Sequence, residues 1–284
     1  MLVVALKLVA GVIEFRLRRL EMANLAATVS LAVALHLGPV EIALRTAFAL
    51  ALNVLLYLNN DWNDVAIDLR NVHRRQDRVR FLAMHSRTAL RTQIVIGAAL
   101  VAAAVAWSPS LLVPLLLGGG TCIWYSSTLK RRPGLDVLAM TLGGAALPLC
   151  GAPTLSPTIV CLAVQLGLYS AVFQMFQLQR DAKEDSAAGV RTTAVVLGQA
   201  ATIWLLRALM LLVSLYAALA TSPWIALVTF LALAIPERAM GVKSRWTLIR
   251  LVYGGAWVLL CVQVFLHERC EGLAWVLARG ALHG

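Results

Sequence analysis

Long apolar stretches recur along the whole chain and are separated by short polar connections. About 17 to 25 mostly apolar residues are enough to cross a bilayer as a helix. On this basis we predict nine transmembrane helices, at residues 20–37, 41–59, 89–107, 110–125, 135–153, 156–179, 199–220, 224–235 and 247–267. The eighth stretch is short, so we expect it to be tilted, broken or longer than its apolar run. No polar segment is long enough to form a separate soluble domain.

Residues 1–19 have a different pattern. Lys7 interrupts their apolar run, and the segment lacks the basic start and the cleavage site of a signal peptide. The spacing of its apolar residues favours an interfacial helix that leads into the first span.

Composition supports a membrane protein. Hydrophobic residues make up 60% of the chain and charged residues 14%, against about 25% charged residues in typical soluble domains. The net charge of +11 first suggests a nucleic-acid partner. Such a partner requires a basic face on a soluble fold, which the apolar pattern excludes.

The basic residues are distributed unevenly between the two sides of the predicted bundle. Twenty of the 25 lysines and arginines lie in the N-terminal segment or in the connections and flanks after the second, fourth, sixth and eighth spans. They are Lys7, Arg16, Arg18, Arg19, Arg70, Arg74, Arg75, Arg78, Arg80, Arg87, Lys130, Arg131, Arg132, Arg180, Lys183, Arg191, Arg238, Lys243, Arg245 and Arg250. Because positive connections stay in the cytoplasm, we expect the N-terminus inside and the C-terminus outside, in a bacterial plasma membrane.

A first acidic cluster lies where the second span ends. Asn60, Asp61, Asp64 and Asp68 stand in the stretch NDWNDVAID, and the spacing places the three carboxylates on one helical face. Like charges on one face repel each other, so the arrangement favours a bound divalent cation. Oxygen ligands indicate Mg2+. The alternative interpretation is a solvated helix end.

A second acidic cluster follows the sixth span. Asp181 and Asp185 are four residues apart on one face, with Arg180 and Lys183 beside them. Alone, this pair is typical of many charged helix ends. Together with the first cluster, on the same predicted side, it favours a site in which Mg2+ ions hold a diphosphate.

Three motifs therefore follow one another at the ends of alternate spans. The first is Asn60, Asp61, Asp64 and Asp68; the second is Tyr125, Ser126, Leu129 and Lys130; the third is Asp181, Asp185, Gly189, Thr192, Leu197 and Gly198. In pattern and order they resemble the NDxxDxxxD, YSxxLK and DxxxD motifs of the UbiA superfamily of intramembrane prenyltransferases. The resemblance runs over nearly the whole chain and implies a single domain, residues 1–284, with helices around a central apolar cavity.

The resemblance also implies roles for individual residues in binding and ionising an allylic isoprenyl diphosphate. The catalytic, Mg2+-binding residues would be Asp61, Asp64, Asp68, Asp181 and Asp185. The diphosphate-binding residues would be Asn60, Arg78, Tyr125, Lys130 and Arg180. Aromatic faces can stabilise the resulting carbocation, and the named candidates are Tyr57, Phe173 and Phe176.

The chain departs from the family pattern in two places. The stretch 77–82 has no Arg-Pro pair, and Gln177 stands where many members have Glu. Two fates of the carbocation therefore stay open. A lipophilic aromatic acceptor attacks it in a prenyltransferase, which we favour, or the chain's own double bonds attack it in a UbiA-type terpene cyclase. A transporter or a lipid-binding scaffold explains the two clusters less well.

Overall fold

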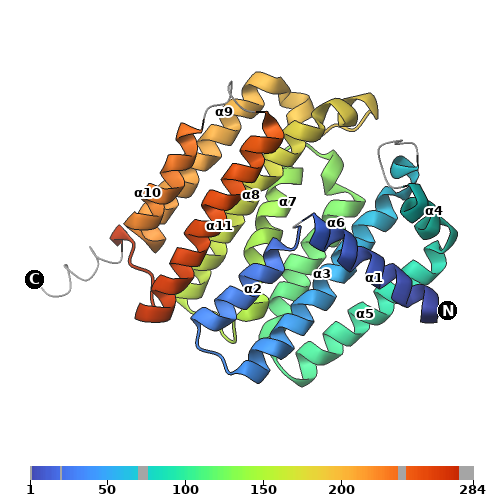
Figure 1. The fold of residues 1–284 in the computed structure, drawn as a ribbon, viewed down its shortest axis with the longest axis horizontal. Coiled ribbons are helices and arrows are strands. Elements are labelled where there is room, and N and C mark those ends of the chain that lie inside the picture. The colour runs from blue at the N-terminus through green and yellow to red at the C-terminus, as the bar shows by residue number, and fades with distance from the viewer. Residues whose placement is uncertain (1, 20, 70–75, 236–240, 275–284) are drawn as a thin grey trace, which may run out of the picture.

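The computed structural model describes residues 2–19, 21–69, 76–235 and 241–274, and within these ranges the chain forms helices and no strands (Figure 1). The α-helices are α1 (Leu2–Arg18), α2 (Ala23–Ala34), α3 (Pro39–Asp68), α4 (Gln76–Met84), α5 (Ser86–Ala106), α6 (Gly120–Ser127), α7 (Leu135–Ala146), α8 (Pro157–Ala187), α9 (Thr193–Tyr216), α10 (Pro223–Leu231) and α11 (Val242–His267). Shorter 3-10 or π segments are η1 (Pro109–Leu111), η2 (Pro114–Gly119), η3 (Leu129–Arg131), η4 (Leu147–Gly151), η5 (Ala217–Thr221) and η6 (Ala232–Ala234).

Six helical stretches are long and apolar enough to cross a membrane: Pro39–Asp68, Ser86–Ala106, Pro109–Ser127, Pro157–Ala187, Thr193–Thr221 and Ser244–His267. Three shorter apolar helices are Ala23–Ala34, Leu135–Gly151 and Pro223–Ala234. These three coincide with the first, fifth and eighth predicted spans. Every predicted span is thus helical, while a total of nine crossings stays a prediction.

Helices α3 and α8 set the position of both acidic clusters. Pro39 at the start of α3 and Pro157 at the start of α8 suit the first helical turn, where no backbone N–H is needed. Ser156 caps α8 by accepting a hydrogen bond from the Ile159 amide at 3.3 Å. The helices are 30 and 31 residues long, so they continue beyond their apolar parts and end in the two Asp motifs.

Packing inside the bundle depends on small residues between α7 and α8. A Cβ added to Gly144 would lie 2.2 Å from the Cβ of Ser170, and one added to Gly167 would lie 2.9 Å from the Thr141 carbonyl oxygen. Glycines at such positions let two membrane helices approach closely. This contact helps to fix α8, and with it the second Asp motif, relative to the rest of the bundle.

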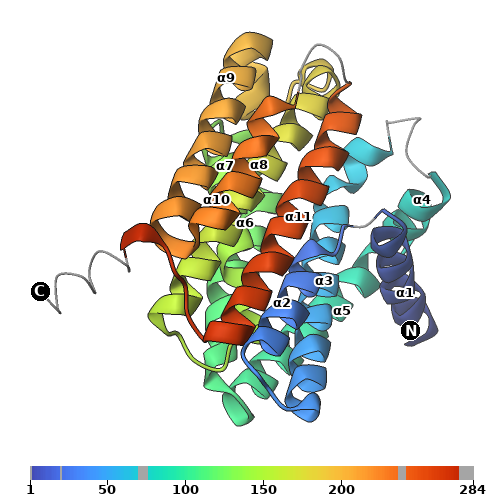
Figure 2. The same cartoon turned by 60° about the vertical axis from the view of Figure 1, so that its left-hand side comes forward.

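Helix α1 crosses the outside of the bundle at an angle to the long helices (Figures 1 and 2). Its Leu8 and Val12 pack against Leu58 of α3 and Leu82 of α4. Other apolar side chains of α1, including Leu2, are exposed. This amphipathic arrangement fits an interfacial helix, and the membrane contact itself stays a prediction.

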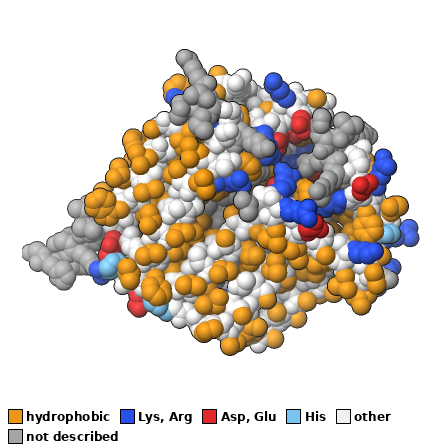
Figure 3. Space-filling view, in the orientation of Figure 1, with side chains coloured by type: hydrophobic (Ala, Val, Ile, Leu, Met, Phe, Trp, Pro, Cys, Tyr) orange, Lys and Arg blue, Asp and Glu red, His pale blue; other side chains and the backbone are white. Residues whose placement is uncertain are grey.

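On the face drawn in Figure 3, many charged side chains gather in one region. Lysine, arginine and acidic side chains gather where α3 ends and around α4, while hydrophobic side chains cover much of the same face (Figure 3). The acidic motifs therefore end in a polar region next to a broad apolar surface.

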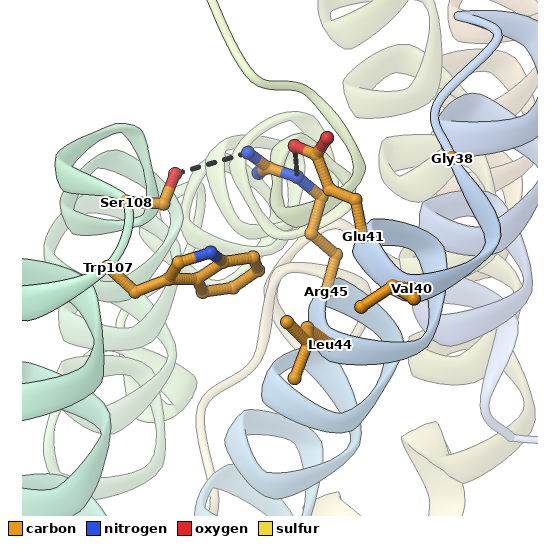
Figure 4. A pocket seen from close by; sticks show the side chains of 7 residues that line it. All are labelled: Gly38, Val40, Glu41, Leu44, Arg45, Trp107 and Ser108. Carbon is orange, nitrogen blue, oxygen red and sulfur yellow. Dashed lines mark hydrogen bonds and ion pairs between the residues drawn. The ribbon is translucent and has the colours of Figure 1, made fainter.

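The opposite end of α3 carries an isolated buried arginine. Arg45 is 2% exposed; its Nε donates to Glu41 at 2.9 Å, and its Nη2 donates to Ser108 at 3.1 Å (Figure 4). Its Nη1 donates to the carbonyls of Cys150 and Ala152, both at 3.1 Å. A depression of about 430 Å³ opens beside it. The Arg45 guanidinium thus joins α3, the α5–η1 turn and η4.

Candidate functional site

The first and second motifs meet through an ion pair. The Lys130 ammonium in η3 lies 2.7 Å from Oδ2 of Asp64 in α3. Asn60, one turn before Asp64, donates to the same carboxylate oxygen at 3.3 Å and accepts from Ser126 at 3.4 Å. Asp64 is 8% exposed, so these contacts hold a nearly buried carboxylate.

Tyr125 and Lys130 also link this cluster to the third motif. Gln174 in α8 donates to the Tyr125 hydroxyl at 3.0 Å. Asp64 and Asp185 are both within electrostatic reach of Tyr125, and the charge of Lys130 acts on Asp185 as well. The second motif therefore contacts the first acidic cluster through Lys130, and contacts α8, the helix that carries the second acidic cluster, through Tyr125.

Asp61 is held by two arginines from two different helices. Nη2 of Arg16 in α1 lies 2.5 Å from Oδ1, and Arg78 in α4 binds Oδ2. Arg16 also pairs with Glu21 at 2.6 Å. Burial opposes the charged form of Arg16, but Asp61 and Glu21 outweigh it, and the pKa of this guanidinium is raised. Arg78 is a predicted site residue, whereas the sequence marked Arg16 only as a topology signal.

In the second cluster, Arg180 binds its neighbour Asp181 with two hydrogen bonds, at 2.6 and 2.8 Å. The Arg180 guanidinium also lies 5.3 Å from the ring centre of Trp246 in α11. Asp185 and Asp68 are each partly buried at the ends of their helices. Six of the predicted cationic or metal-binding groups thus already form three ion pairs, which are Asp61 with Arg78, Asp64 with Lys130, and Asp181 with Arg180.

A fully buried carboxylate that the sequence did not single out supports the second cluster. Asp136, near the start of α7, accepts from the Thr193 amide at 2.7 Å and from the Thr193 hydroxyl. The Gly134 amide donates to that hydroxyl at 2.7 Å. These bonds fix the start of α9 and the loop that follows Asp185. The sequence feature that could have identified it is an acidic residue two positions after Gly134, in the stretch Pro133-Gly134-Leu135-Asp136.

The three aromatic candidates for cation stabilisation have different surroundings. The ring of Tyr57 lies against the Arg16 guanidinium at 4.4 Å, and its hydroxyl donates to the Glu21 carbonyl. Phe176 is 1% exposed, and Phe173 lies 5.9 Å from the ring of Tyr253. Tyr57 therefore already faces a protein cation, and so does Phe176, whose ring centre lies 5.2 Å from the Arg245 guanidinium. The role of all three rings in binding a carbocation stays a prediction.

The donor set fits Mg2+ bound together with a phosphate-containing ligand. Within the described residues, no three carboxylate, histidine or cysteine side chains converge as a ready metal cage. Mg2+ is commonly held by only one or two carboxylates plus substrate phosphates and water. Asp61 and Asp64 on one side, and Asp181 and Asp185 on the other, could supply such pairs once their arginine and lysine partners move.

The sequence model of the UbiA prenyltransferase family matches residues 23–267. The chain belongs to this family. Together with its six long apolar helices, this membership makes it a multi-pass membrane protein. Helix α1 lies before the matched region. No curated protein matches the sequence.

Two solved structures have the UbiA fold seen here. One is a UbiA homologue from Archaeoglobus fulgidus bound to GPP and Mg2+, with 16% identity and a TM-score of 0.65, covering 92% of this chain and 99% of that one. The other is a digeranylgeranylglyceryl phosphate synthase, with 14% identity and a TM-score of 0.62, covering 91% of this chain and 99% of that one. At these identities, the similarity to the two structures shows a shared fold and nothing more specific.

Proposed function

We propose that the protein is a Mg2+-dependent intramembrane prenyltransferase that ionises an allylic isoprenyl diphosphate and transfers the prenyl group to an aromatic or other lipophilic acceptor. The observation that carries the proposal is the pairing of Lys130 with Asp64, together with the hydrogen bond that joins Tyr125 to α8, the helix that carries Asp181 and Asp185. Family membership supports the general type of reaction. The GPP and Mg2+ bound to the Archaeoglobus homologue support the donor and the metal.

In the proposed reaction, the C1–O bond of the donor breaks and its electron pair leaves with the diphosphate. Bound Mg2+ would neutralise charge on this leaving group. Asp61, Asp64, Asp68, Asp181 and Asp185 would hold the metal, while Lys130 and Arg78 would bind phosphate oxygens. The acceptor then forms a bond to C1 of the carbocation and loses a proton. The apolar interior of the bundle would exclude competing water.

An aromatic cluster in the bundle favours the second candidate, a terpene cyclase. Tyr169 of α8 stacks on Tyr253 of α11 with ring centres 4.6 Å apart, and Phe173 lies beside Tyr253. Phe173 and Tyr169 precede Asp181 by about 12 and 18 Å along the helix. Rings at this depth could stabilise charge on distal carbons of a folding prenyl chain.

A single experiment separates the two candidates. The protein in detergent is incubated with Mg2+ and C10, C15 or C20 allylic diphosphates, without an acceptor. A prenyltransferase should leave the diphosphate unchanged or merely hydrolysed, and should form a new product only when lipophilic aromatic acceptors are added. Cyclic hydrocarbons or alcohols would identify a cyclase. Failure to bind any of the three diphosphates with Mg2+ would contradict both.

The proposed orientation places the acidic clusters on the cytoplasmic side of a bacterial plasma membrane. Arg132 is exposed beside η3, and Val40 is 74% exposed at the far end of α3. In a variant without the native cysteines, Arg132→Cys should react only with reagent from the cytoplasm, and Val40→Cys only from outside. The reverse pattern would invert the orientation and the side from which the diphosphate enters.

A further inference from the structure

Arg16 connects the N-terminal helix to the predicted metal-binding cluster through two separate nitrogen atoms. Nη1 lies 2.6 Å from Glu21, and Nη2 lies 2.5 Å from Oδ1 of Asp61. The Arg16 side chain is 12% exposed. One guanidinium thus bridges a carboxylate outside the motifs and a carboxylate of the first motif.

Neighbouring residues support the contact of Arg16 with Glu21, and this support does not depend on Asp61. The Tyr57 hydroxyl donates to the Glu21 carbonyl, and the Tyr57 ring lies 4.4 Å from the Arg16 guanidinium. Arg19 also pairs with Glu21, at 2.9 Å. If Asp61 were withdrawn, Arg16 would keep its carboxylate partner and its aromatic partner. The guanidinium would stay at the site.

The contact on Asp61 conflicts with metal binding. Arg16 and Arg78 occupy the two oxygens of this carboxylate, which a metal ion would also need. In addition, Nε of Arg16 is buried and has no hydrogen-bond acceptor among the described residues. A buried donor without a partner carries a desolvation cost that an incoming anion can relieve.

We propose that Arg16 exchanges partners when the site fills, a step that rests on the proposed function. In the empty site it neutralises Asp61 and competes with the metal ion. When Asp61 turns to the metal, Glu21 and Tyr57 keep Arg16 in place, and its freed N–H groups bind an oxygen of the diphosphate. Helix α1, which precedes the region shared with the family, thereby becomes part of the donor site.

Exchange predicts opposite effects of one substitution on two measured affinities. In Arg16→Gln, Mn2+ alone should bind about threefold to tenfold more tightly than in the wild type, because a competitor for Asp61 is gone. Inorganic pyrophosphate in saturating Mn2+ should bind about tenfold more weakly, because a charged donor is lost. A residue that only stabilised the fold would weaken both.

The measurement is calorimetric or spin-resonance titration of the full-length protein in detergent. Arg18→Gln is the matched control, because Arg18 lies on the same helix, is 63% exposed and pairs with Glu14, away from the cluster. Both its affinities should stay within about twofold. Arg16→Lys is a second variant, which keeps the proposal testable if Arg16→Gln misfolds. Its single ammonium should leave Mn2+ affinity near the wild-type value and still weaken pyrophosphate binding, because it cannot bridge two anions.

Two results would overturn the proposal in distinguishable ways. A wild-type protein that binds no pyrophosphate with Mn2+ would refute the proposed function, and partner exchange with it. Wild-type binding combined with unchanged or uniformly weakened affinities in Arg16→Gln and Arg16→Lys would refute partner exchange alone.

Discussion

Arg45 and Arg16 lie near opposite ends of α3, and both pair a buried guanidinium with a carboxylate and an aromatic ring. Arg45 binds Glu41, Ser108 and two backbone carbonyls, and its guanidinium lies 5.5 Å from the ring of Trp107. Arg16 binds two carboxylates, and its Nε has no acceptor in the described part of the chain.

The difference lies in what could replace each partner. The carbonyls of Cys150 and Ala152 cannot move away without rearranging η4 and the residue that follows it, so these two contacts of Arg45 are part of the fold. Asp61 contributes a side-chain carboxylate, which can rotate to bind a metal ion, so we propose that its contact with Arg16 is exchangeable. We therefore interpret Arg45 as a structural residue and Arg16 as a ligand-binding residue of the proposed site.

Removing divalent metal should have the largest effect on turnover. It should affect the end of α3 near Arg16 and leave the end near Arg45 unchanged. Treatment with EDTA should reduce turnover of the allylic diphosphate to background, because its charge is no longer neutralised as it leaves. The thermal unfolding temperature should change little, because the Arg45 end uses no metal. Product formation before and after Mg2+ is restored measures the effect. Turnover that survives thorough chelation would contradict the assignment.

Replacing Asp64 with Asn should reduce kcat/KM about a hundredfold or more. Asn keeps the shape of Asp64 but loses the charge that would hold the metal and that now binds Lys130. Thermal unfolding measured in parallel should resemble that of the wild type, so the loss reflects binding and ionisation. Wild-type turnover in this variant would show that the diphosphate site lies elsewhere.

Replacing Arg45 with Gln should give the reverse pattern. The free energy of unfolding should fall by about 2 to 4 kcal/mol, because the buried carbonyls of Cys150 and Ala152 lose their donor. Turnover per folded molecule should stay within about twofold. Denaturant unfolding in detergent and an activity assay on the same sample provide both values.

The exposed Arg87, at the start of α5, provides the control for Arg45. Arg87→Gln should change the unfolding free energy by less than about 0.5 kcal/mol. An Arg45→Gln protein that is stable but inactive would contradict the proposed difference between a structural Arg45 and a functional Arg16.

The smallest effect is expected at Glu184. It lies between Asp181 and Asp185 in the sequence, but about 60° to 100° from the face that they share. Its side chain is exposed. Glu184→Gln should therefore retain turnover within about twofold, whereas Asp181→Asn should lose about a hundredfold. Equal loss in both variants would mean that the second cluster uses a different helical face.

The predicted helices and motifs depend on local patterns, and this explains which features could be foreseen. Apolar length located the helical segments, and the spacing of Asp61 and Asp64 placed them one turn apart on one face. The contact between Arg16 and Asp61 joins residues 45 positions apart, and the contact between Asp136 and Thr193 joins residues 57 apart. Contacts between residues so far apart in the sequence cannot be predicted from the periodicity within one helix.

The sequence by itself determined an all-helical membrane protein, its family and the residue types of the proposed diphosphate site, because helix length and side-chain spacing are properties of neighbouring residues. Only the tertiary structure decided that α1 reaches Asp61, that Lys130 pairs with Asp64 and that Asp136 holds the start of α9. These contacts depend on how the helices pack, since packing brings together charges that the chain keeps far apart.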